Sequence, residues 1–240
     1  MVNAFDAAPD RPEHIDAILN GLDRYNPETT GTFQDYVASQ CENQTYDSYA
    51  NLALLKLYQF NPHLSRDETV TNILVKSLTV FPSPDFGLCL SLLPPHVLSK
   101  ATPNPSSGSL AEAVQRLATL HSSLTDARYP DFWAALDSDD LVADLVADVQ
   151  GFDEIMRVRM AVVVGQCMQG VERAVLEGWL NLSGDKFEKF VADVCGWKIE
   201  GEKVVIPLNK ENEARSTIVR ESVKFEQFGR TVRRAYEQPA

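Results

Sequence analysis

The side chains that most often perform catalysis are few in this chain, and they lie far apart. Its four histidines are His14, His63, His96 and His121. No Cys-x-x-Cys, His-x-x-x-His or His-Glu-x-x-His pair occurs, so a zinc site would need ligands from distant segments. The glycine-containing run GQCMQG at residues 165–170 is followed by Val171, where a phosphate-binding loop needs Lys and then Ser or Thr. We therefore expect no bound metal and no cofactor.

The four cysteines are the remaining candidate nucleophiles. They are Cys41, Cys89, Cys167 and Cys195, and the last three lie in apolar sequence that predicts helices. Thiols in such surroundings are usually inert packing groups, although a Cys–His pair formed by the fold stays open as an alternative. Their wide spacing favours reduced thiols in a cytosolic protein. No Gly-x-Ser-x-Gly motif occurs either, so we predict that the protein is not an enzyme.

The overall charge argues against two classes of partner. The 240 residues include 22 Lys and Arg against 34 Asp and Glu, a net charge of −12. Phosphate backbones and anionic membranes both attract basic proteins, so neither is expected as the main partner. The opening MVNAFDAAPDRPEH has no apolar run of the kind found in signal peptides, and residues 77–99 contain four prolines. We expect a cytoplasmic protein that binds no membrane.

Residues 1–150 predict a helical-repeat domain of the HEAT-like kind. Residues 46–60 are apolar on nearly all sides and stop at Asn61-Pro62, which is typical of a helix covered by neighbours. Helical spacing recurs before and after this segment, with short turns between. The Pro- and Ser-rich segment from Pro94 to Ser109 predicts an exposed loop.

Residues 151–208 predict a winged helix, so the expected fold class is mainly α with one small β-hairpin. Three helices are expected at residues 152–167, 171–180 and 184–195, and Gly196 suits a left-handed position after the last of them. The hairpin is expected from Trp197 to Glu200 and from Val204 to Ile206. Its outer strand, formed by Val204, Val205 and Ile206, would offer a free edge to a partner.

Three stretches identify a family. They are DRYNPE at residues 23–28, YANLALLKLYQFNP at residues 49–62 and DFWAALD at residues 131–137. They resemble the subunit K family of eukaryotic translation initiation factor 3, a PCI-type family similar to subunits of the proteasome lid and the signalosome. The resemblance covers most of residues 20–90 and 129–206. The segment 94–109 looks inserted relative to the family, and the chain after Ile206 matches weakly.

The resemblance implies a non-catalytic scaffold subunit of this initiation factor, acting in protein biosynthesis through protein–protein interfaces. It implies other subunits as partners, with subunit L as the direct neighbour, and an indirect association with the small ribosomal subunit.

The last segment, residues 209–240, predicts a helix from Glu211 onward. One face carries large apolar side chains at roughly helical spacing: Ile218, Phe225, Phe228, Val232 and Tyr236. Related lid-type subunits place such helices in a shared bundle, so the resemblance implies docking on a partner. The alternative is that the helix folds back on its own winged helix.

Two charged features complete the candidate surfaces. An acidic run free of basic residues offers either a docking patch for a basic partner or a solvated face, and its candidate residues are Asp137, Asp139, Asp140, Asp144 and Asp148. The segment from Arg215 to Arg234 holds six basic and two acidic residues, a local charge of +4. An RNA-binding winged-helix protein acting through this segment is the alternative function.

Overall fold

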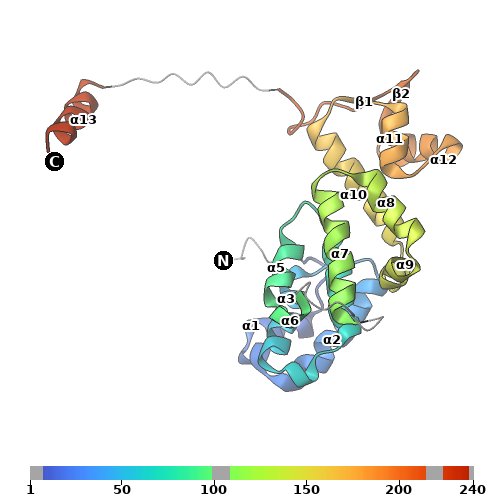
Figure 1. The fold of residues 1–240 in the computed structure, drawn as a ribbon, viewed down its shortest axis with the longest axis vertical. Coiled ribbons are helices and arrows are strands. Elements are labelled where there is room, and N and C mark those ends of the chain that lie inside the picture. Colours follow the sequence, from blue (N-terminus) through green and yellow to red (C-terminus); the bar gives the residue numbers. More distant parts are fainter. Residues whose placement is uncertain (1–7, 99–108, 215–223, 238–240) are drawn as a thin grey trace.

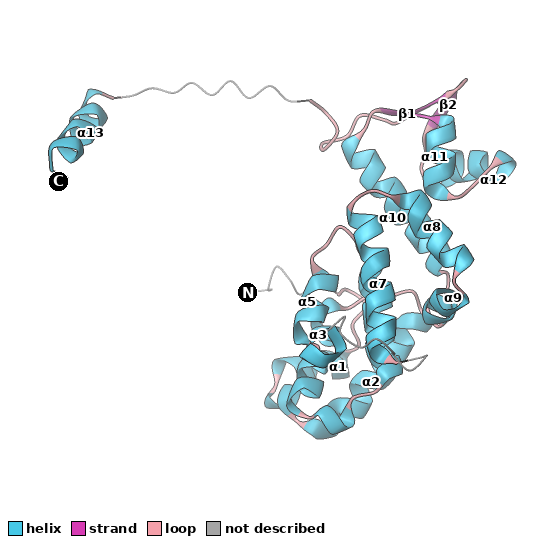
Figure 2. Cartoon of the chain, viewed as in Figure 1, coloured by secondary structure: helices cyan, strands magenta, loops and turns pink. Residues whose placement is uncertain are grey.

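The computed structural model describes residues 8–98, 109–214 and 224–237 and shows a mainly helical chain with one small sheet (Figure 1, Figure 2). The predicted fold class is thereby confirmed. The first five α-helices are α1 (Glu13–Asn20), α2 (Thr30–Glu42), α3 (Ser48–Phe60), α4 (Asp67–Leu78) and α5 (Asp85–Leu92). Short 3-10 turns at Leu22–Tyr25, Pro27–Thr29 and Pro62–Leu64 join them.

Helix α4 is the enclosed centre of this domain. Ten of its twelve residues are buried, and it packs against α2, α3, α5, α7 and α9. Even Lys76 is buried, where its Nζ donates to the carbonyl oxygen of Gln40 at 3.1 Å, near the end of α2. Burial lowers the pKa of Lys76, because removing the ammonium group from water disfavours its charged form.

Four further helices complete the domain: α6 (Pro95–Leu98), α7 (Leu110–Thr125), α8 (Tyr129–Ser138) and α9 (Asp140–Ala147). Helix α6 corrects the expectation of an exposed loop from Pro94 to Ser109. Its proline occupies the first helical position, where no intrahelical N–H is needed, and Val97 is buried as α6 packs on α7. Residues 99–108 of that segment lie outside the described residues.

The winged helix begins with α10 (Phe152–Cys167), α11 (Arg173–Leu180) and α12 (Gly184–Lys189), which continues as a π-helical turn at Phe190–Val194. Gly196 has φ +66°, as its expected left-handed position requires. Helix α8 contacts the winged helix. Trp133 Nε1 donates to the Trp179 carbonyl oxygen at 2.8 Å, and the centroids of the Phe132 and Phe152 rings lie 6.4 Å apart. One buried apolar core therefore extends from α1 to the sheet.

The sheet has three strands rather than a single hairpin. They are β1 (Gly170–Glu172), β2 (Lys198–Glu200) and β3 (Lys203–Val205), all antiparallel in the order β1-β3-β2. The prediction that Val171 belongs to a helix is wrong, because Val171 lies in β1 and pairs with Val204 of β3. The expectation of a free outer strand at β3 is also wrong, since β3 pairs on both sides and lies at the centre of the sheet. Among the described residues, the unpaired edges belong to β1 and β2.

The chain after β3 is fixed to the end of α10 before it continues to the C-terminal helix. Asn212 Nδ2 donates to the carbonyl oxygens of Gly165, Met168 and Pro207 at 3.1, 3.1 and 3.0 Å. The expected helix start at Glu211 is therefore wrong, because residues 210–213 form turns and bends. The last helix, α13, spans Phe225–Glu237 and follows residues 215–223, which lie outside the described residues.

Candidate partner-binding surfaces

Cysteines and histidines are the side chains that a metal site or a nucleophilic site would need. No three His, Cys, Asp or Glu side chains come together in the described part of the chain in a way that could hold a metal ion. Burial raises the pKa of Cys41 and Cys195 to about 11 and that of Cys89 to about 12. These thiols therefore stay protonated at neutral pH, which is the unreactive form. His121 stacks on Phe86 with ring centroids 4.5 Å apart, and burial lowers its pKa.

No helix within the described residues is both long and apolar enough to cross a membrane. Among the described residues, those that the sequence singled out for partner binding lie on α8, α9, β3 and α13 or directly beside them.

Helix α13 carries four exposed large apolar side chains. Its relative exposures are 93% for Phe225, 64% for Phe228, 46% for Val232 and 87% for Tyr236. These four residues, here called the α13 stripe, follow the spacing i, i+3, i+7 and i+11, so they share one face. Ile218, the fifth residue predicted for this face, lies outside the described residues. None of the residues of α13 is buried, and both docking on a partner and folding back on the winged helix stay predictions.

The α13 stripe cannot be explained by the helix alone. A 13-residue helix is marginal in water, and Gly229 in its middle lowers its stability further. Packing of an apolar face against another surface is what normally keeps such a helix folded. The stripe is therefore the strongest candidate for a surface that a second element covers.

The three hairpin candidates divide according to the face of the sheet on which they lie. Val204 and Ile206 are buried in the core of the winged helix, and the Ile206 amide donates to the Gln169 carbonyl oxygen at 3.0 Å. Val205 points the other way and is 37% exposed. Backbone pairing of a partner at β3 is excluded by its two neighbours, so only the Val205 side chain remains available.

The acidic candidates gather on α8, α9 and the turn that follows α9. Asp137, Asp140, Asp144 and Asp148 are exposed. Asp139 instead caps α9, where its Oδ1 accepts from the Leu141 amide at 3.1 Å, and its other oxygen contacts Arg116 of α7. Arg116 also pairs with Glu112 at 2.7 Å. Arg116, Leu141 and Asp144 line a shallow hollow of about 180 Å³ between α7 and α9. The acidic run contains no basic residue in the sequence, but in the fold Arg116 of α7 contacts its Asp139.

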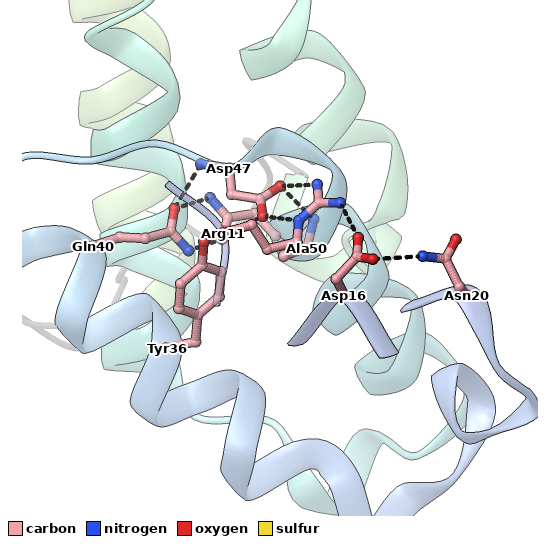
Figure 3. A network of polar contacts seen from close by, with 8 residues as sticks. Arg11, Asp16, Asn20, Tyr36, Gln40, Asp47 and Ala50 are labelled. Carbon is pink, nitrogen blue, oxygen red and sulfur yellow. Dashed lines mark hydrogen bonds and ion pairs between the residues drawn. The ribbon is translucent and has the colours of Figure 1, made fainter. Parts of the chain in front are cut away.

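A buried polar network holds the start of the chain against α2 and α3 (Figure 3). The guanidinium of Arg11 donates to both carboxylate oxygens of Asp47, at 2.7 and 2.9 Å. The same carboxylate accepts from the Ala50 amide at 3.0 Å, so it caps α3, and from the Tyr36 hydroxyl at 3.3 Å. Gln40 Oε1 accepts from the Asp47 amide at 2.9 Å. This network joins the start of the chain to α2 and α3.

Sequence reasoning missed both Arg116 and this network. Asp47 directly precedes the helix α3, which is a capping signal, but nothing in the sequence pairs it with Arg11, 36 residues away.

Comparisons with known proteins agree with the arrangement of helices and sheet. The sequence profile of the CSN8/PSMD8/EIF3K family matches residues 64–217. Three curated relatives are called eukaryotic translation initiation factor 3 subunit K. Those of Sclerotinia sclerotiorum and Phaeosphaeria nodorum are 64% and 65% identical to this chain over 98% of both sequences. That of Aspergillus fumigatus is 56% identical over 99% of both.

Proposed function

Because the chain belongs to the CSN8/PSMD8/EIF3K family, we propose that it is a non-catalytic scaffold subunit of eukaryotic translation initiation factor 3. In this role it contributes protein–protein interfaces to the initiation of protein synthesis in the cytoplasm. Its helical domain and winged helix share one core and so form a firm support for those interfaces. The observation that carries the proposal is the α13 stripe, four large apolar side chains exposed on a helix too short to stand alone.

The partner of the α13 stripe is another subunit of the factor, with subunit L as the direct neighbour. A helix of a partner that packs against the stripe would bury two phenylalanines and a tyrosine, and aromatic side chains are common anchors at the centres of interfaces. The small ribosomal subunit is then reached indirectly, through the assembled factor. The exposed carboxylates of α9 form a second surface, suited to a basic segment of a partner.

The proposal is tested by purifying the tagged full-length chain from its host and identifying the proteins that accompany it. We expect subunits of the initiation factor with the wild type and their loss with the double variant Phe225→Ala/Phe228→Ala. The matched control is Arg230→Ala/Arg234→Ala, which truncates two side chains on the opposite face of α13. Retention of the subunits by the stripe variant would contradict the proposed role of the stripe.

The same control examines the alternative function, RNA binding through the basic C-terminal segment. Contacts to phosphates are salt-dependent and need the arginines rather than the phenylalanines. If the arginine variant alone loses its partners, and if ribonuclease removes them from the wild type, the RNA-binding function is correct and the scaffold proposal is wrong.

A further inference from the structure

A second unpartnered apolar surface runs along α10. Ile155, Val158, Val162 and Gln166 line two adjoining hollows of about 320 and 310 Å³, which share Val158 and Val162. At the end near the sheet, the hollows are also bordered by Val194, Cys195 and Trp197. Val158, Val162 and Val194 are exposed, although large apolar side chains are normally covered. We call this surface the α10 groove.

The α10 groove and the α13 stripe have the same spacing. The four groove residues on α10 follow i, i+3, i+7 and i+11, and so do the four residues of the stripe. At 1.5 Å per residue, each set extends for about 16 Å. Three of the four groove residues and all four stripe residues are apolar, and two helices with side-chain rows of equal spacing can pack side by side.

The chain also leaves the core beside this groove. Asn209 lines it, and its Nδ2 donates to the Gly165 carbonyl oxygen at 2.7 Å. Ten residues lie between Ala214, the last described residue there, and Phe225, so the eleven Cα–Cα steps allow the start of α13 to lie at most about 40 Å away. That reach exceeds the length of the groove, and α13 can therefore lie along it.

We propose that in the free subunit the α13 stripe docks into the α10 groove of the same chain. Antiparallel packing places Phe225 near Trp197, where the chain leaves the core, and Tyr236 near Ile155. The α10 groove is thus a holding site that covers the stripe until another subunit takes it. This inference goes beyond the proposed function, because it concerns the isolated chain.

Photocrosslinking of the purified full-length chain tests this docking. A benzoylphenylalanine at position 228 should crosslink to peptides of α10 and of residues 194–197 within the same chain, in a yield independent of protein concentration. The same group at Gln227, on the opposite face of α13, should give no crosslinks to the groove. Absence of groove crosslinks from position 228 would overturn the proposal. Crosslinks between two chains that increase with concentration would also overturn it and would assign the groove to a second copy.

Two aspartate substitutions, one in the α10 groove and one outside it, test whether crosslinking depends on the groove. Val162→Asp should reduce the crosslink yield roughly tenfold, because a docked helix would bury the new carboxylate without a partner. Val175→Asp on α11, where the valine is exposed to a similar degree, should leave the yield unchanged. An unchanged yield with Val162→Asp overturns the proposal. If the thermal midpoint shows that Val162→Asp unfolds, Val158→Asp provides the same comparison.

Discussion

Ten of the twelve residues of α4 are buried, whereas none of the thirteen residues of α13 is. Yet α13 has the more two-sided pattern, with apolar residues along one face and arginines along the other. Helix α4 instead includes Thr, Asn, Lys and Ser among its buried residues. Burial therefore depends on how many neighbours surround a helix, and an apolar stripe shows only that a covering surface is needed. For α4 that surface is formed by the neighbouring helices of its own domain. For α13 the proposed surfaces are the α10 groove and a partner subunit.

The largest effect on stability is expected at the buried ion pair between Arg11 and Asp47. Arg11→Ala should lower the free energy of unfolding by about 3–5 kcal/mol, because it leaves the Asp47 carboxylate buried without its cation. Urea unfolding followed by circular dichroism measures this change. Arg128→Ala, which removes an exposed pair with Asp126 and Asp131, is the control and should cost less than about 1 kcal/mol. Equal losses would show that the Arg11 network does not hold the domain together.

A moderate effect is expected from the buried thiol of Cys89 at high pH. Burial raises its pKa from 9.0 to about 12, so the unfolded chain releases this proton first as the pH rises above 9. The unfolded state is then favoured, and Cys89 alone should lower stability by about 1.4 kcal/mol per pH unit between pH 9 and 12. Urea unfolding of the wild type and Cys89→Ala at pH 8 and pH 10 measures the difference. The variant should lose less stability over this interval, and parallel losses would contradict the burial of this thiol.

The smallest effect on stability is expected at α13. Phe225→Ala/Phe228→Ala should change the free energy of unfolding of the isolated chain by less than about 1 kcal/mol, because undocking α13 from the α10 groove leaves the buried core intact. Buried phenylalanines typically cost about 3–5 kcal/mol each when truncated, and Phe132→Ala provides that reference. Urea unfolding of both variants makes the comparison. A loss of several kcal/mol in the double variant would place the α13 stripe in the core and refute its role as a docking surface.

The sequence predicted the helical core well because residues 46–60 and the helices around them carry long, regular apolar patterns. It missed β1, since three residues are too few to show alternation and Val171 equally suits the helix that follows. That omission caused the error at β3, whose position in the sheet depends on β1. The α10 groove was missed for a different reason. Val158 and Val162 look like core residues in sequence, and only the arrangement of neighbouring elements shows that each is 41% exposed.

The anchoring of the chain at Asn212 affects how the two proposed binding surfaces, the α10 groove and a partner subunit, compete for the α13 stripe. The three hydrogen bonds of Asn212 fix one end of the connecting chain to α10, and the covalent length of that chain confines α13 to a sphere of about 40 Å radius. One helix in that volume corresponds to an effective concentration on the order of several millimolar. A partner present at micromolar concentration must therefore bind the α13 stripe about a thousandfold more tightly than the α10 groove does. Partners that bind the α13 stripe only weakly would not displace it from the α10 groove. The tether therefore favours partners of high affinity.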